Sequence, residues 1–318
     1  MSKDTILVTG ANGQIGSVLT KSLQEHYGIR QVLATDIRPP AEATEGLFLI
    51  LDVTDRQALN DLVSRHRVTQ IYHLAAILSA KGESAPLHTW DINMQGLFHI
   101  LEAAREHRVA KVFHPSSIAV FGSEAPRMQT PQNASLQPST VYGISKVAGE
   151  MWAQYYFRRY ALDIRSLRYP GVIGHQSAPG GGTTDYAVEM YHYALQGRPY
   201  PCFLRPDTAL PMIYMDDAIR ATRLLMEAPA DLIRIRTSYN LSALTFTPAE
   251  LADSIRRHIP SFQVDYQPDF RQQIADSWPA SIDDRAARSD WDWHPAFDLS
   301  GMTADMLLHL QERYLAPA

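Results

Sequence analysis

Short apolar runs alternate with amphipathic segments through the first half of the chain. The runs predict strands at residues 5–8, 31–35, 47–51, 70–74, 111–115 and 164–169. Between the first two, Ile15, Val18, Leu19 and Leu23 recur at helical spacing, and Gly28 stands where a C-cap is expected. Thr54 or Asp55 is the expected N-cap of a second helix, and further helices are expected at 90–107 and, after a proline, at 139–160.

This alternation predicts an α/β fold with a doubly wound parallel sheet covered by helices on both faces. After residue 170 the sequence becomes rich in glycine and proline, which is typical of loops and short elements. Helices are expected there at 185–195, 215–227, 247–258 and 298–313. A strand at 238–241 is expected to return to the main sheet. We therefore expect a dinucleotide-binding domain at 1–172, joined by 212–242, and a smaller, interleaved substrate-binding domain formed by 173–211 and 243–318.

Composition narrows the class of protein. The 318 residues are 45% hydrophobic and 20% charged, which is typical of a globular chain, and the net charge of −5 argues against nucleic-acid and anionic-membrane partners. A single cysteine excludes a disulfide within the chain and a Cys-cluster zinc site, and the 12 histidines show no metal-ligand spacing, so no metal is expected. The absence of a signal-like or membrane-spanning apolar run predicts a soluble, cytoplasmic protein.

A glycine motif follows the first strand and opens the first helix. Glycines permit a tight turn and close approach of the backbone to a diphosphate, and a helix N-terminus favours an anion there. The residues predicted to bind this part of a cofactor are Gly10, Asn12, Gly13, Gln14, Ile15 and Gly16. The alternative is a plain glycine-rich turn.

An acidic residue twenty positions beyond Gly16 indicates which cofactor the site prefers. Asp36 ends the second strand, where a carboxylate accepts hydrogen bonds from ribose hydroxyls and repels a 2′-phosphate, so NAD is favoured over NADP. Arg38 argues for NADP instead, because a nearby arginine can bind the 2′-phosphate.

A tyrosine and a lysine four residues apart open the helix at 139–160. Tyr142 and Lys146 share one helix face, and a nearby ammonium favours the phenolate, so Tyr142 is the predicted general base. Ser117, at the end of a strand twenty-five residues earlier, is expected to hold the substrate oxygen, with Ser116 as its neighbouring candidate. Asn93 is expected to anchor a water leading to Lys146. The alternatives are a serine pair that merely ends a strand and an exposed helical Asn93.

Together these motifs resemble the extended, epimerase-like short-chain dehydrogenases, a Rossmann-type superfamily. Three stretches of the second half narrow the resemblance to short-chain-type L-threonine 3-dehydrogenases: 168–173, 178–188 with its Gly-Gly-Gly-Thr-Thr-Asp-Tyr segment, and 210–218. The tail, at 277–284 and 290–293, is similar too. The resemblance implies oxidation of the L-threonine 3-hydroxyl by NAD⁺ to 2-amino-3-oxobutanoate.

The resemblance also implies further contacts. Beyond the residues already given, cofactor contacts are expected from Ile37, Asp52, Val53, Leu74, Ala75, Ala76, Tyr169, Pro170 and Val172, and from Tyr142 and Lys146. Substrate contacts are expected from Ser79, Ser117, Tyr142, Gly182, Thr183, Thr184 and Asp185. Asp52 alone reads equally as a loop residue or cap, and Thr183–Thr184 as a simple N-cap of the next helix.

Three functions remain open at this point. The first is the threonine dehydrogenase, expected as a homodimer through its two long helices. The second is a nucleotide-sugar epimerase or dehydratase, which an acidic residue in the glycine-rich stretch disfavours. The third is a non-catalytic NAD-sensing protein, which the Ser/Tyr/Lys set disfavours.

Overall fold

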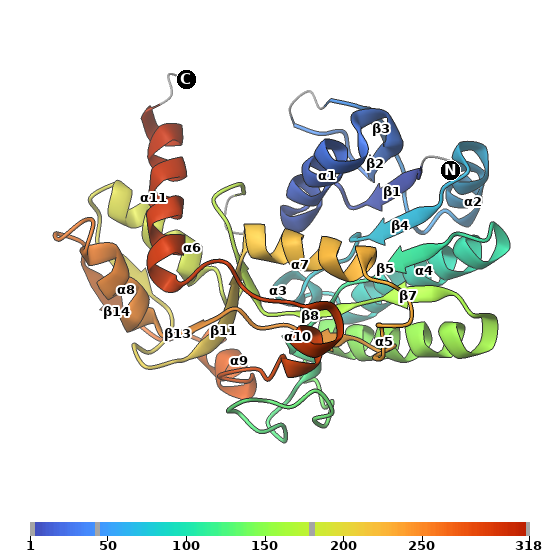
Figure 1. Ribbon diagram of the computed structural model, residues 1–318. Helices are drawn as coiled ribbons and strands as arrows, with labels where there is room; N and C mark the ends of the chain where they lie inside the picture. The colour runs from blue at the N-terminus through green and yellow to red at the C-terminus, as the bar shows by residue number, and fades with distance from the viewer. Residues whose placement is uncertain (1–3, 42–44, 178–181, 316–318) are drawn as a thin grey trace. The chain divides into compact units, whose positions relative to one another are not determined.

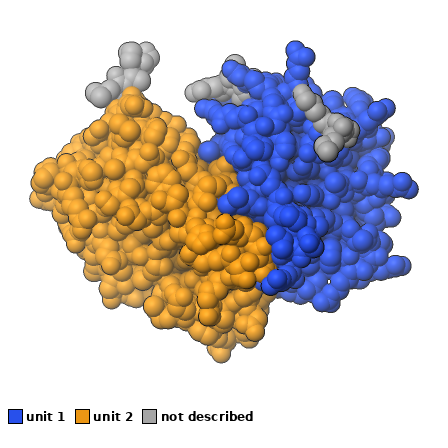
Figure 2. Space-filling model, viewed as in Figure 1, with its two compact units in different colours: residues 1–120, 140–168, 221–239 blue, residues 121–139, 169–220, 240–318 orange. Residues whose placement is uncertain are grey.

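The chain forms two compact units (Figures 1 and 2). The computed structural model describes residues 4–41, 45–177 and 182–315. Unit 1 comprises 1–120, 140–168 and 221–239, and unit 2 comprises 121–139, 169–220 and 240–318. The two units interleave along the sequence. Their bounds differ from the expected domain bounds at 121–139, 169–172, 212–220 and 240–242, all of which belong to unit 2.

Unit 1 is built on the predicted parallel sheet, whose six strands run in the order β3-β2-β1-β4-β5-β7. The strands are β1 (Ile6–Thr9), β2 (Val32–Asp36), β3 (Leu47–Ile50), β4 (Gln70–His73), β5 (Lys111–Phe113) and β7 (Asp163–Arg165). β1 and β4 are completely buried, which explains the continuous apolar start of β1, Ile6 to Val8, whereas β4 buries the polar Gln70 and His73 at its two ends. The strand order reverses between β1 and β4, and ligands of such sheets bind outside the carboxyl ends at that point.

Helices connect these strands. They are α1 (Gln14–Tyr27), α2 (Arg56–His66), α3 (Ser79–Gly82), α4 (Pro86–Glu106) and α5 (Val141–Tyr160), with 3₁₀ turns at Ile29–Gln31 and Ile118–Val120. Asp55, one of the two expected caps, accepts from the Ala58 amide at 3.0 Å. Thr140 caps α5 through the Gly143 amide at 3.0 Å, one residue inside the predicted start. α4 begins four residues before its predicted start, with Pro86 in its first turn.

Two strand predictions were wrong in detail. The predicted strand at 164–169 is two strands: β7 ends at Arg165, and β8 (Leu167–Tyr169) pairs elsewhere. The strand predicted at 238–241 is β12 (Tyr239–Asn240), which joins β8 and β6 (Ser116–Ser117) in a separate sheet instead of the main one. The break falls at Ser166, whose hydroxyl bonds that of Ser238 at 2.9 Å while its carbonyl accepts from the Tyr239 amide.

Unit 2 contains two small sheets and a helical layer. One sheet has the order β13-β11-β9 (Leu244–Phe246, Leu210–Tyr214, Gly171–Ile173), and the other pairs β10 (Tyr200–Cys202) with β14 (Val264–Tyr266). The helices are α6 (Tyr186–Leu195), α8 (Pro248–Arg256), α9 (Arg271–Ser277), α10 (Arg285–Trp291) and α11 (Leu299–Leu315). α6 packs against α8 and α11. α7 (Met215–Glu227) carries the chain from unit 2 back to unit 1.

Among the helices in the described part of the chain, none combines the length and the apolar character needed to cross a bilayer.

Candidate active site

The glycine motif forms a tight turn between β1 and α1. Gly10 has φ +72°, and a Cβ on it would lie 2.6 Å from the Ala75 amide nitrogen, just after β4. A Cβ on Gly16 would lie 2.1 Å from the Gly10 carbonyl oxygen. No side chain caps α1 at its N-cap, Gly13. The turn therefore brings the ends of β1 and β4 against each other and presents the helix N-terminus at the switch point of the sheet.

Asp36 is tied to this turn. Its Oδ2 accepts from the Asn12 amide at 3.1 Å, and the Asn12 side chain donates to the Arg38 carbonyl at 2.8 Å. The carboxylate thus stands beside the glycine turn, where a ribose diol would reach it. Ile37 is 60% exposed next to it and offers an apolar surface to a base.

The cofactor contacts expected after β3 and β4 also lie in unit 1. Leu51, whose amide donates to the Asp36 carbonyl at 2.9 Å, brings the end of β3 beside that of β2. Asp52 then accepts from the amide and hydroxyl of Thr54 at 2.8 and 2.7 Å, so it forms a local turn, while the helix cap itself is Asp55. Val53 is buried behind it. Leu74, Ala75 and Ala76 continue from β4 beside Gly10.

The Tyr/Lys face of α5 is fastened to the segment that follows β5. The Lys146 ammonium donates to the Pro115 carbonyl at 2.8 Å and lies 5.3 Å from the centroid of the Tyr142 ring. The Ser117 hydroxyl hydrogen-bonds the Tyr142 phenol and also accepts from the Ala119 amide at 3.2 Å. The expected trio of Ser117, Tyr142 and Lys146 is therefore brought together within unit 1.

The electrostatics of this trio are set by burial. Burial raises the pKa of Tyr142 to about 12, and the hydrogen bond with Ser117 acts in the opposite direction. Burial lowers the pKa of Lys146 to about 8, against the charge of Glu150, which raises it. The lowered tyrosine pKa expected of a general base is thus not a property of the ligand-free chain, and the ionised phenol requires further positive charge.

Asn93 is buried, so the alternative of an exposed helical asparagine was wrong. Its amide group bonds both the amide and the carbonyl of Ile77, at 2.8 and 3.1 Å, and donates to the Ser145 hydroxyl at 3.3 Å. Asn93 therefore connects the segment after β4 to α5, where its partner Ser145 directly precedes Lys146. Ser79 begins α3 two residues beyond Ile77.

Sequence reasoning missed a buried ionic group behind Lys146. Glu150 accepts from the Ser116 hydroxyl at 2.6 Å and from two nitrogens of Arg168 at 2.9 and 2.7 Å, and all three residues are buried. Three consecutive residues thus each hydrogen-bond a side chain of α5: Pro115 bonds Lys146, Ser116 bonds Glu150, and Ser117 bonds Tyr142. Spacing gave one signal that could have revealed this, since Glu150 lies four residues beyond Lys146 on the same helix face.

Residues expected from the second half lie in unit 2. Tyr169, Pro170 and Val172 fall at β8 and β9, and Gly182 to Asp185 precede α6. The N-cap of α6 is Asp185, so the alternative of a simple threonine cap was wrong; its carboxylate accepts from the Gly182 amide at 2.8 Å. Thr183 is buried and Thr184 packs on Gly171. Residues 178–181 of the diagnostic stretch lie outside the described residues.

Comparison with known proteins identifies the family of this chain. The sequence profile of the NAD dependent epimerase/dehydratase family matches residues 6–241, and the chain belongs to this family. An uncharacterized epimerase/dehydratase of Staphylococcus haemolyticus is 47% identical over 314 residues, covering 98% of each chain. The glycine turn, the open N-terminus of α1 and Asp36 fit the family's cofactor, which is NAD.

Several solved structures similar to this chain are L-threonine dehydrogenases. A GalE-like L-threonine dehydrogenase from Cupriavidus necator, in its holo form, is 52% identical over 96% of this chain and 99% of its own, with a TM-score of 0.95. The L-threonine dehydrogenase from Clostridium difficile is 43% identical, with coverage of 99% and 100% and a TM-score of 0.96. A metagenomic L-threonine 3-dehydrogenase described as monomeric is 47% identical, with coverage of 97% and 99% and a TM-score of 0.94. The expected homodimer therefore stays a prediction.

Proposed function

We propose that this chain is an NAD-dependent L-threonine 3-dehydrogenase, which converts L-threonine and NAD⁺ to 2-amino-3-oxobutanoate, NADH and a proton. The observation that carries the proposal is the Ser117–Tyr142–Lys146 trio, held in the unit that also carries the glycine turn and Asp36. Support for the substrate comes from the similar solved structures whose names are L-threonine dehydrogenases.

Tyr142 takes the proton of the 3-hydroxyl in this mechanism. Bound NAD⁺ supplies a hydride acceptor and a positive charge. With its pKa at about 12 in the free chain, the phenol needs about 5 kcal/mol of differential stabilisation to ionise near pH 8. The Lys146 ammonium is already present in the free chain, so the positive charge of bound NAD⁺ would supply this stabilisation. Ser117 holds the substrate oxygen as it becomes a carbonyl. The C3–H bond electrons leave as hydride while the O–H proton passes to Tyr142.

The amino and carboxylate groups of threonine need partners of opposite charge or matching hydrogen bonds. We assign these to the stretch from Gly182 to Asp185, with Ser79 as a further hydrogen-bonding group. Amides and hydroxyls of the stretch receive the carboxylate, and Asp185 receives the ammonium. An acidic group there also disfavours the diphosphate of a nucleotide sugar.

The test is NADH formation at 340 nm with L-threonine, beside L-allo-threonine, L-serine and 3-hydroxybutyrate. We expect strong turnover of L-threonine alone. Tyr142→Phe should lower kcat by about 10³-fold while NAD⁺ binding, followed by fluorescence, is kept. Tyr155→Phe is the matched control, because Tyr155 is 49% exposed on the same helix. Near-normal kcat in Tyr142→Phe would refute the mechanism.

A second candidate is an epimerase or dehydratase acting on a nucleotide sugar. It is favoured by the names of curated relatives at 46–47% identity. Incubation with UDP-glucose or a dTDP-sugar, analysed by NMR, separates the two: a converted sugar together with unreacted L-threonine would replace the dehydrogenase proposal.

A further inference from the structure

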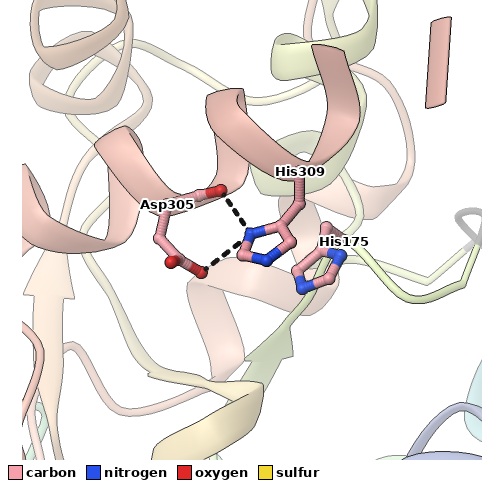
Figure 3. A group of neighbouring side chains, drawn as sticks. All are labelled: His175, Asp305 and His309. Atoms are coloured by element: carbon pink, nitrogen blue, oxygen red, sulfur yellow. Dashed lines mark hydrogen bonds and ion pairs between the residues drawn. The ribbon is translucent and has the colours of Figure 1, made fainter. Parts of the chain in front are cut away.

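Three metal-ligating side chains converge in unit 2, and none of them has been assigned a role above. His175, Asp305 and His309 each offer one donor atom, and these atoms lie within 4.8 Å of one another (Figure 3). His175 follows β9, whereas Asp305 and His309 lie one helical turn apart on α11. No metal was expected from the histidine spacing, because spacing along the chain does not reveal ligands that come from distant segments.

We infer that His175, Asp305 and His309 form a site for one divalent transition-metal ion of the Zn²⁺ type. Two imidazoles and one carboxylate are a donor set that Zn²⁺ takes in proteins. Donors around a tetrahedral Zn²⁺ ion lie about 3.3 Å apart, since each bond is about 2.0–2.1 Å. The donor atoms of this cluster, which lie within 4.8 Å of one another, therefore need to approach by up to about 1.5 Å.

The bonds around the cluster resemble those that orient metal ligands. His309 Nδ1 contacts the Asp305 carbonyl oxygen at 3.0 Å, so this nitrogen carries the proton and Nε2 keeps its lone pair. The Tyr214 hydroxyl donates to Asp305 Oδ2 at 2.5 Å, which leaves Oδ1 for an ion. Such outer hydrogen bonds fix ligands in place and tune metal affinity.

His175 is positioned by the same helix. Arg313, one turn beyond His309, donates to the carbonyls of His175 and Gln176 at 2.7 and 2.9 Å. The Gln176 amide group lies 3.0 Å from His175 Nε2, and its oxygen is buried without a hydrogen-bond partner. With the amide turned so that this oxygen accepts from Nε2–H, the lone pair of His175 Nδ1 is left for ligation.

One movement is required for coordination. The rings of His175 and His309 are stacked, with centroids 4.1 Å apart and planes 13° apart, so their lone pairs run side by side. One ring must turn about its Cβ–Cγ bond, a torsion with a broad energy well. The charges nearby favour a cation: Asp305 and Asp216 carry two carboxylates, and Arg313 carries the opposing guanidinium. A bound ion would tie the end of β9 to α11.

Isothermal titration of the untagged full-length chain with Zn²⁺ tests this inference without reference to catalysis. We expect one ion per chain, and with Co²⁺ the visible absorption of a nitrogen-ligated ion. His309→Ala, and separately His175→Ala, should weaken Zn²⁺ binding by at least about 10-fold. His294→Ala is the matched control, since His294 pairs with Asp292 at 3.5 Å on the surface of the same unit, without a third donor.

Tyr214→Phe provides a second variant that keeps all three ligands. Because it removes the hydrogen bond to Asp305, we expect it to weaken Zn²⁺ binding by about 10-fold without abolishing it. Thermal unfolding of each variant in EDTA reports whether it folds. Absence of Zn²⁺ binding by the folded wild-type chain, or equal affinity in wild type, His175→Ala and His309→Ala, would overturn the inference.

Discussion

Replacing Lys146 with methionine should make the protein more stable while it destroys catalysis. Lys146 is 4% exposed, and burial lowers its pKa from 10.5 to about 8. This difference corresponds to a penalty of about 3 kcal/mol for keeping the amine charged in the folded chain. Methionine fills similar space without a charge. It leaves the Pro115 carbonyl without its donor, which costs about 1 kcal/mol. The expected net gain at pH 7 is about 2 kcal/mol.

The gain depends on pH in a defined direction. Because the folded pKa lies below the unfolded value, the unfolded chain binds more protons between pH 8 and 10.5, and wild-type stability rises across that interval. The advantage of Lys146→Met is therefore full below pH 8 and disappears near pH 10.5. Urea unfolding at pH 7 and pH 10 measures it, with Lys21→Met, at an exposed position, as the control.

The reasoning is refuted if Lys146→Met is less stable than wild type at pH 7. It is equally refuted if the difference in unfolding free energy is the same at pH 7 and pH 10. Either result would mean that burial does not destabilise the charged Lys146 amine. The pKa of Tyr142 would then depend on something other than a desolvated ammonium.

Three further changes probe the NAD site and its support. Gly16→Ala places a Cβ 2.1 Å from the Gly10 carbonyl oxygen, so we expect at least about 10-fold weaker NAD⁺ binding by calorimetry; unchanged affinity would mean the turn is not the diphosphate site. Asp36→Ser removes the carboxylate that repels a 2′-phosphate, so the NADP⁺/NAD⁺ affinity ratio should rise, and a constant ratio would contradict the assignment. Glu150→Gln removes the carboxylate that pairs with the buried Arg168, which should lower the unfolding free energy by about 3–5 kcal/mol in urea; a loss below about 1 kcal/mol would contradict the buried pairing.

The parallel sheet could be predicted because its strands are short apolar runs, most of which are separated by helices with readable caps. Asp55 and Gly28 mark helix ends through local hydrogen bonding and backbone conformation, which the sequence displays directly. The break at Ser166 could not be predicted, because Ile164 and Leu167 on either side are both apolar and buried. The partners of those strands, not the pattern, decide that two sheets meet there.

The candidate site was predictable where spacing along one helix or one turn determines it. Tyr142 and Lys146 share a face by their separation alone, and the glycines mark a turn that side chains would block. Other features depend on contacts between distant segments. Asn93 is buried against Ile77 and Ser145, and Glu150 meets Arg168 only after α5 packs beside β8. The raised pKa of Tyr142 likewise follows from burial, which no spacing reveals.

Transfer of deuterium from L-[3-²H]threonine to NAD⁺ directly tests the proposed oxidation of the 3-hydroxyl. The protein is incubated with NAD⁺ and the labelled amino acid, and the nicotinamide ring is examined by NMR. The account predicts deuterium at C4 of the reduced nicotinamide, one atom per 2-amino-3-oxobutanoate formed, and none with Tyr142→Phe. Recovery of unreacted labelled threonine from wild-type protein that binds NAD⁺ would contradict it.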